Sequence, residues 1–271
     1  MTLRQTAIAA ARAAGEIQRA HYGTILGVDL ATRHDVKLEA DRLCEQAIVG
    51  TIRRDWPDHA ILTEEAGPIG GDGDHWWLID PLDGTVNFFY GLPYFCTSVA
   101  CYRRAVGERG GFPRPLSTLG EPLVGVVYAP PTDELFVAEA GEGATCNGVG
   151  IHAAAATELS EAIAAVGFGS REGSERHYVE QVQRLAPHLR KLRCLGSAAY
   201  DLCNVACGRL TAFYEMRLRP WDIAAGHVVL REAGAVLDAI ELEEQTWNVV
   251  AAAPGVYERF RDLAREAVAG G

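Results

Sequence analysis

The feature that most constrains the fold of this chain is the segment 76–87, which reads Trp-Trp-Leu-Ile-Asp-Pro-Leu-Asp-Gly-Thr-Val-Asn. Its four leading apolar residues are typical of a buried strand, and the Asp, Pro and Gly residues that follow are typical of a strand end and a turn or helix start. Asp80 and Asp83 therefore lie together at a strand end, with the carbonyl of Leu82 between them. Close carboxylates repel unless a proton or cation separates them, and hard oxygen ligands suit Mg²⁺.

An ordinary structural interpretation competes with the metal site. Asp83 could merely cap a helix and Asp80 could begin a turn. The metal interpretation gains support from acidic residues at other element ends: Asp41 in the first turn of an expected helix, Glu64 after the short strand 60–62, and Asp222 at the head of another helix. Each of these alone suits a helix dipole, a solvated surface or a cap, but together they predict a shared site.

Length and composition indicate which class of protein this is. The chain has 271 residues, 48% hydrophobic and 23% charged, which is typical of an ordinary globular protein of one large or two intimately packed domains. We expect a boundary within the Gly- and Ala-rich stretch 141–156, with an N-terminal α+β domain at 1–150 and a C-terminal α/β domain at 151–271. No apolar run is long enough to cross a bilayer and no signal peptide is evident, which predicts a cytoplasmic protein that does not bind membranes.

Charge and cysteine content narrow the function. A formal net charge of −11 without a basic run argues against a nucleic-acid partner. The seven cysteines lack Cys-x-x-Cys spacing, so we expect buried reduced thiols. No His-Glu-x-x-His arrangement supports zinc hydrolysis.

Short strands alternate with helices, which predicts an α/β layered fold. Expected helices cover residues 2–23, 41–57, 176–189, 197–207, 222–233 and 256–268, and expected strands cover 60–62, 76–80, 95–102, 123–128, 134–138, 162–166, 191–195, 210–214 and 248–253. The segment 103–122 is expected to be a polar loop.

The segments 61–65, 77–88 and 220–226 look like the three signature motifs of the inositol monophosphatase family, the Mg²⁺-dependent, lithium-sensitive phosphatases, in the family's order and spacing. Further similarity at 128–130, 141–144, 147–148, 196–199 and 231–234 extends over nearly the whole chain. The resemblance implies a layered α-β-α-β-α sandwich of the inositol monophosphatase/fructose-1,6-bisphosphatase type and a homodimer.

The resemblance also implies metal ligands and catalytic residues. Glu64, Asp80 and the Leu82 carbonyl would hold a first Mg²⁺, and Asp80, Asp83 and Asp222 a second. Glu64 would help to hold a third ion, while Asp41 and Thr85 would position the attacking water.

A further set of positions matches the family's substrate contacts. The N–H groups of Gly84 and Thr85 would receive phosphate oxygens at a helix start. The residues implied to contact substrate are Asp83, Gly84, Thr85, Gly196, Ser197, Ala198 and Glu215.

One departure from the family pattern lies upstream of Asp41. Leu38 replaces the usual hydroxyl residue and Lys37 precedes it. Because leucine offers no hydroxyl group, this change affects the binding of a third ion and the positioning of Asp41. Lys37 is either a phosphate contact or a solvated surface residue.

The motifs define the phosphate end of a substrate and leave the alcohol open. Inositol monophosphate leads, because the carboxylate of Glu215 suits a polyol, with histidinol phosphate, a 3′(2′),5′-bisphosphate nucleotide and fructose bisphosphate as alternatives. A non-catalytic or moonlighting binding protein on the same fold is a different class of function.

Overall fold

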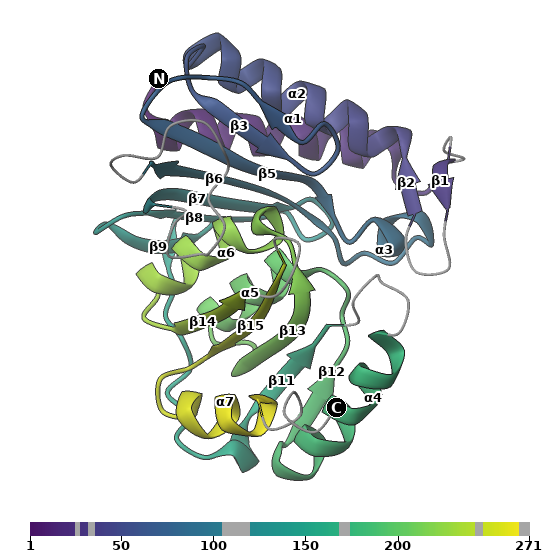
Figure 1. Cartoon of the computed structure of the whole chain (residues 1–271), viewed down its shortest axis with the longest axis vertical. Coiled ribbons are helices and arrows are strands. Elements are labelled where there is room, and N and C mark those ends of the chain that lie inside the picture. Colours follow the sequence, from purple (N-terminus) through teal and green to yellow (C-terminus); the bar gives the residue numbers. More distant parts are fainter. Residues whose placement is uncertain (25–27, 32–35, 105–119, 168–173, 242–245, 266–271) are drawn as a thin grey trace.

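Helices and sheets alternate through the molecule in the order helix, sheet, helix, sheet, helix (Figure 1). The computed structural model describes residues 1–24, 28–31, 36–104, 120–167, 174–241 and 246–265. This arrangement confirms the predicted fold class. The expected loop 103–122 falls mostly on residues 105–119, outside the described ranges.

The larger sheet belongs to the N-terminal half. Its strand order is β10-β9-β8-β7-β6-β5-β3-β4. Within the described residues, β3 and β5 are its only parallel pair, and its other neighbouring strands are antiparallel. Its strands are β3 (Ala60–Thr63), β4 (Pro68–Ile69), β5 (His75–Asp83), β6 (Cys96–Arg103), β7 (Glu121–Ala129), β8 (Glu134–Glu139), β9 (Gly143–Cys146) and β10 (Val149–Gly150). A separate antiparallel pair, β1 (Val28–Ala31) and β2 (Val36–Leu38), precedes it.

Two helices, α1 (Leu3–His21) and α2 (Glu39–Asp55), cover the outer face of this sheet (Figure 1). Side chains alternate between the faces of a strand. Accordingly Trp77 and Ile79 of β5 pack in the cluster with α1 and α2, while Trp76 and Leu78 pack on the opposite side, in the central core.

The central helices, α5 (Ala198–Ala206) and α6 (Pro220–Glu232), lie between the two sheets (Figure 1). Two glycines allow close packing here. A Cβ at Gly125 of β7 would lie 2.6 Å from the Ala225 carbonyl oxygen, and one at Gly226 would lie 2.6 Å from Leu202 Cδ1. The backbone of α6 therefore rests directly on the larger sheet.

The smaller sheet has the strand order β12-β11-β13-β15-β14 and is covered on its far side by α4 (Ser174–Leu185) and α7 (Tyr257–Arg265). Its strands are β11 (Ile163–Val166), β12 (Lys191–Arg193), β13 (Ala212–Leu218), β14 (Val236–Glu241) and β15 (Trp247–Ala252). The larger sheet ends at Gly150 and the smaller begins at Ile163, which is compatible with the proposed division at 150/151. The central core draws on both halves.

Three local expectations need correction. Strand β5 continues through Pro81 to Asp83, because a register irregularity between Asp80 and Asp83 accommodates the proline. Strands β4, β9, β10 and β14 were not predicted. Strand β13 covers Ala212–Leu218, so it begins later than the predicted strand 210–214 and continues past Glu215, which that strand was expected to reach.

All seven cysteines are free, and Cys194 is exposed, against the prediction of burial. Among the helices described, none combines the length and apolar character needed to span a bilayer.

Candidate functional site

The parallel strands β3 and β5 place Glu64 and Asp80 side by side. Thr63 pairs with Ile79, and the Glu64 N–H donates to the Ile79 carbonyl at 3.3 Å. Leu62 and Leu78 face the central helices. By strand alternation Glu64 and Asp80 face the same way.

Helix α6 brings Asp222 to this edge. Asp80 pairs with Ser98 of β6, and the Ser98 hydroxyl donates to the Trp221 carbonyl at 3.2 Å. The Asp222 carboxylate accepts the Arg219 N–H at 2.7 Å, which satisfies one donor of the helix N-terminus.

The N-terminus of α5 binds the Asp83 carboxylate. The Ser197 hydroxyl and the Ala199 N–H both donate to Asp83 Oδ2 at 2.7 Å, and the Ala198 N–H donates to Oδ1 at 3.3 Å. Burial raises the pKa of Asp83, while these hydrogen bonds oppose the rise. Ser197 and Ala198, expected to contact the substrate alcohol, thus hold a carboxylate of the site.

Helix α2 contributes Asp41, which is only 3% exposed. Asp41 accepts the Leu38 N–H at 2.7 Å and lies 3.1 Å from the Thr85 hydroxyl, which in turn lies 2.9 Å from the Leu82 carbonyl oxygen. Burial raises the pKa of Asp41 to about 7, and the charge of Glu65 contributes. The structure therefore places the Asp41 carboxylate and the Thr85 hydroxyl in hydrogen-bond contact.

Asp80 is the electrostatic centre of the site. Its side chain is buried, and burial raises its pKa well above the ordinary value. The next largest causes are the negative charges of four further carboxylates, in decreasing order Glu64, Asp83, Asp222 and Asp41. Carboxylates far apart in the sequence thus lie close enough to Asp80 for their charges to raise its pKa.

Glu215 belongs to the same negative region. Burial raises its pKa well above the ordinary value, followed by the charges of Asp222, Asp201 and Asp83. A Cβ at Gly167 would lie 1.9 Å from Glu215 Cδ, so only glycine leaves room for this carboxyl group.

The turn at Gly84 explains the glycine of the central motif. Gly84 has φ 93°, in the left-handed region, and precedes the short helix α3 (Thr85–Phe89). A Cβ there would lie 3.0 Å from the Tyr94 carbonyl oxygen and 3.2 Å from that of Gly196. The amide of Asn87 ties this turn together, donating to the carbonyls of Tyr94 and Leu195 at 2.8 Å each.

The donor set suits a hard cation, since it consists of carboxylates with a carbonyl oxygen nearby. Within the described residues, however, no group of three or more His, Cys, Asp or Glu side chains stands ready to hold a metal ion. One physical reason is that two of the carboxylates already accept hydrogen bonds, Asp83 from α5 and Asp222 from the Arg219 N–H. Asp83 Oδ2 also accepts a hydrogen bond from the Cys96 thiol at 3.7 Å, while Oδ1 accepts only the Ala198 N–H among the bonds described. The residues therefore fit a cation chemically without forming a closed ligand shell.

A model of the inositol monophosphatase family matches residues 1–268. The chain belongs to this family. It is 37% identical over 257 residues to the Nus factor SuhB of Escherichia coli K12, covering 92% of this chain and 91% of that protein.

Solved structures agree with this membership. The inositol monophosphatase of Anabaena superposes with a TM-score of 0.79 at 32% identity, covering 97% of this chain and 95% of that one. The IMPase of Thermotoga maritima superposes with a TM-score of 0.83 at 31% identity, covering 98% and 97%. Family membership supports a phosphatase.

At the family's usual hydroxyl position, Leu38 is 1% exposed and packs in an apolar cluster with Leu82, Phe88 and Phe95. This family member therefore uses position 38 for packing beside the site. The side chain of Lys37 lies outside the described part of the chain.

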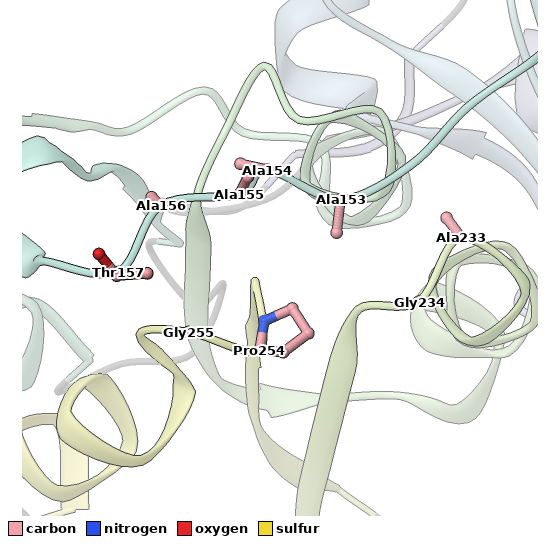
Figure 2. Close-up of a pocket in the computed structure, with 9 residues that line it drawn as sticks. All are labelled: Ala153, Ala154, Ala155, Ala156, Thr157, Ala233, Gly234, Pro254 and Gly255. Atoms are coloured by element: carbon pink, nitrogen blue, oxygen red, sulfur yellow. The ribbon is translucent and has the colours of Figure 1, made fainter.

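A cavity of about 310 Å³ lies elsewhere, between the connecting segment after β10 and the loop after β15 (Figure 2). It contains none of the predicted site residues, and its lining offers mainly methyl groups and backbone: Ala153, Ala154, Ala155, Ala156, Thr157, Ala233, Gly234, Pro254 and Gly255. The convergent carboxylates, rather than this cavity, are the chemically distinctive region.

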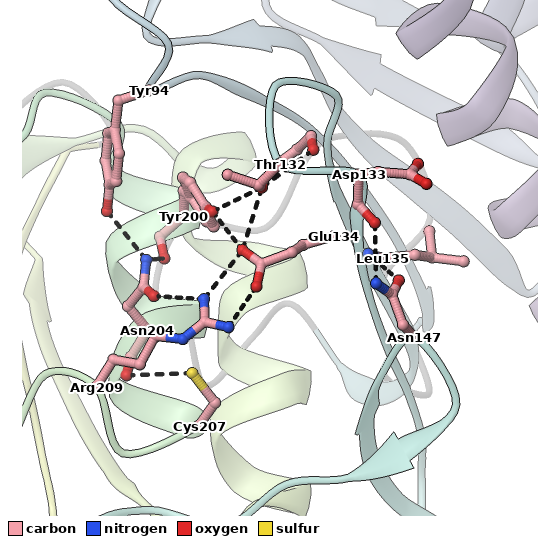
Figure 3. A network of polar contacts seen from close by, with 11 residues as sticks. Tyr94, Thr132, Asp133, Glu134, Leu135, Asn147, Tyr200, Asn204, Cys207 and Arg209 are labelled. Atoms are coloured by element: carbon pink, nitrogen blue, oxygen red, sulfur yellow. Dashed lines mark hydrogen bonds and ion pairs between the residues drawn. The ribbon is translucent and has the colours of Figure 1, made fainter.

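Sequence reasoning missed a polar network that supports α5 (Figure 3). Tyr94 donates to Asp201 at 2.5 Å, and the Asn204 amide donates to the Tyr94 hydroxyl at 3.1 Å. Arg209 continues the network to Asn204 at 3.2 Å and to Glu134 of the larger sheet. These residues carry no local motif, so only their tertiary contacts show that they connect the two halves behind Asp83.

Proposed function

We propose that this protein is a Mg²⁺-dependent phosphomonoesterase of a small polyol phosphate, with inositol monophosphate as the substrate. The observation that carries the proposal is the convergence of Glu64, Asp83, Asp222 and Asp41 on the buried Asp80. Such a cluster repels a phosphate dianion unless cations intervene. Bound Mg²⁺ would supply the positive charge and lower the pKa of an attacking water.

The proposed ligand sets are those that the resemblance implies: Glu64, Asp80 and the Leu82 carbonyl for one ion, and Asp80, Asp83 and Asp222 for another, with a third ion beside Glu64. The start of α3 would receive phosphate oxygens, because the first N–H groups of a helix have no partner within the helix. Gly196 and Glu215 would face the alcohol, together with Ser197 and Ala198.

Asp41 and Thr85 are the proposed proton-handling pair. The Thr85 hydroxyl has one proton and two acceptors in reach, Asp41 at 3.1 Å and the Leu82 carbonyl at 2.9 Å. Its oxygen can therefore accept a proton from water while it donates its own to Asp41. A carboxyl group with a pKa of about 7 is suited to exchanging protons near neutral pH.

Thr85→Ala is expected to lower kcat by about a hundredfold with little change in KM, because the hydroxyl acts on the nucleophile and not on the bound ester. Thr85→Ser keeps the hydroxyl and should retain most of the activity. Steady-state kinetics at saturating Mg²⁺ provide the comparison. Equal kcat values for wild type and Thr85→Ala would remove Thr85 from the mechanism.

Glu215→Gln is expected to reduce kcat/KM for inositol monophosphate by about tenfold more than for histidinol phosphate, since the hydroxyls of a polyol would then donate to a neutral amide oxygen instead of a carboxylate. Gly167→Ala should have the same effect, because the new methyl group displaces the Glu215 carboxyl group. Glu121→Gln, an exposed glutamate paired with Arg103, is the matched control. If kcat/KM ranks the substrates in the same order in Glu215→Gln, Gly167→Ala and wild type, then Glu215 does not determine substrate selectivity.

A phosphate-release screen tests the function itself. The substrates are inositol monophosphate, histidinol phosphate, a 3′,5′-bisphosphate nucleotide and fructose bisphosphate, each with and without Mg²⁺ and Li⁺. We expect release from inositol monophosphate only with Mg²⁺, and inhibition by Li⁺. No release from any ester by the folded protein with Mg²⁺ would overturn the proposal.

A second candidate is a binding role on a macromolecular partner, with or without catalysis. The name Nus factor, carried by the SuhB relatives, favours it. The net charge of −11 argues against direct contact with nucleic acid, so we propose a protein partner. We also propose a homodimer, which sedimentation analysis of the full chain can test.

A further inference from the structure

Glu45 is a buried carboxylate to which the proposed chemistry assigns no task. It lies on α2 one turn after Asp41 and is 7% exposed. Residues four apart share a helix face, so Asp41 and Glu45 both point toward the ends of β3 and β5. A buried carboxylate is unfavourable unless it is hydrogen-bonded or paired, which makes its partners informative.

Those partners are in the turn that carries Glu64. Glu45 Oε2 accepts the N–H of Glu65 at 3.2 Å and the N–H of Ala66 at 3.1 Å. The same turn is closed by a hydrogen bond from the Thr63 N–H to the Gly67 carbonyl at 3.0 Å. Glu45 thus binds the backbone immediately after Glu64, while the Glu64 N–H is held against β5.

Two charge-assisted hydrogen bonds to one oxygen connect this turn to α2, and the Ala66 N–H also donates to the Thr63 hydroxyl within the turn at 3.1 Å. If the bonds to Glu45 are lost, the Thr63–Gly67 and Glu64–Ile79 hydrogen bonds remain, but the segment after Glu64 is no longer held by α2. Its order must then be restored when a cation binds, which opposes binding. Groups that orient metal ligands typically change metal affinity by about 10- to 100-fold. One turn earlier on α2, Asp41 contacts Thr85, which follows the end of β5. Helix α2 therefore contacts the segments that follow both β3 and β5.

We propose that Glu45 is a positioning residue that fixes the turn 64–66 and so directs Glu64 toward Asp80, thereby setting the affinity for Mg²⁺. The inference rests on the proposed function, because it assumes that Glu64 binds a cation. This positioning role differs from one in which the negative charge of Glu45 simply attracts the cation to the site. The two roles are separable, because charge and hydrogen-bonding reach can be removed independently.

The experiment is calorimetric titration of Mg²⁺ into the full chain, without substrate, for wild type and three variants at Glu45. Glu45→Ala should weaken Mg²⁺ binding by about 10- to 100-fold. Glu45→Asp keeps the charge but is one methylene too short, and should weaken binding similarly. Glu45→Gln keeps an acceptor oxygen and loses the charge, and should stay within about fivefold of wild type. Glu39→Ala, which removes an exposed acid of the same helix, is the control.

Circular dichroism of each variant accompanies the titrations, and Glu45→Asp and Glu45→Gln carry the test if Glu45→Ala does not fold. The inference is overturned if Glu45→Asp binds as tightly as wild type, since the charge alone would then be sufficient. It is also overturned if Glu45→Gln binds as weakly as Glu45→Asp, since an acceptor oxygen with the right reach would then not be sufficient. Wild-type protein that takes up no Mg²⁺ refutes the proposed function and this inference with it. Uptake by wild type with equal affinity in all variants refutes the inference alone.

Discussion

Asp80→Asn is expected to reduce turnover by at least about a thousandfold, which corresponds to ~4 kcal/mol of transition-state stabilisation. Asp80 is the residue on which the other carboxylates converge, and it would contact both principal ions. Asparagine has nearly the same shape, and its oxygen can still accept the Leu82 N–H, which Asp80 accepts at 3.1 Å. The substitution therefore removes charge without opening a cavity.

The melting temperature of Asp80→Asn provides an independent test of the role of Asp80 in Mg²⁺ binding. In a chelator, Asp80→Asn should melt no lower than wild type, because it relieves repulsion among buried carboxylates. Added Mg²⁺ should raise the melting temperature of wild type, since a ligand that binds the native state stabilises it, and should have little effect on the variant. Asp74→Asn, an exposed acid at the opposite end of β5, is the control. Near-native turnover in Asp80→Asn would exclude Asp80 as a bridging ligand.

Gly125→Ala is expected to lower the free energy of unfolding by about 2 kcal/mol, because the added methyl group meets α6. Its Cβ would lie 2.6 Å from the Ala225 carbonyl oxygen and 2.8 Å from Val228 Cβ. Backbone and β-branched atoms cannot move aside as a flexible side chain can, so α6 must shift. Since α6 carries Asp222, the affinity for Mg²⁺ should fall as well.

Urea denaturation and Mg²⁺ titration measure the two effects. Gly50→Ala is the matched control, because a Cβ at Gly50 of α2 meets nothing within 4 Å and alanine favours a helix. We expect Gly50→Ala to be neutral or stabilising. If Gly125→Ala unfolds at the same urea concentration as wild type, the close approach of α6 to β7 is contradicted.

Local patterns predicted the elements that carry the site. The apolar runs before Glu64 and Asp80 correctly predicted two strands, because a fully buried strand needs no alternation. The helix that begins near Asp222 was also predicted, since an apolar segment follows a capping residue. Strand β14 was missed because Val236–Glu241 mixes acidic and apolar residues in a strand that is mostly half-buried, so neither a continuous nor an alternating pattern is evident.

The supports of the site had weaker signals. Glu45 lies between apolar positions on α2, and its spacing of four residues from Asp41 is the only sequence cue to its role. Tyr94 and Asp201 are separated by more than a hundred positions and belong to no motif. Their partners are set by how α5 packs between the sheets, which a local pattern does not encode.

The sequence by itself determined the residue types and their order: acidic residues at strand ends and helix starts, a glycine where the backbone must enter the left-handed region, and a family-wide set of motifs. These follow from local chemistry, because caps, turns and buried strands depend on near neighbours. Only the tertiary structure decided that α5 binds Asp83, that Gly167 makes room for Glu215 and that α2 holds the turn after Glu64. Such contacts depend on the packing of distant layers, where the position of each helix is set by the side chains it meets across the core.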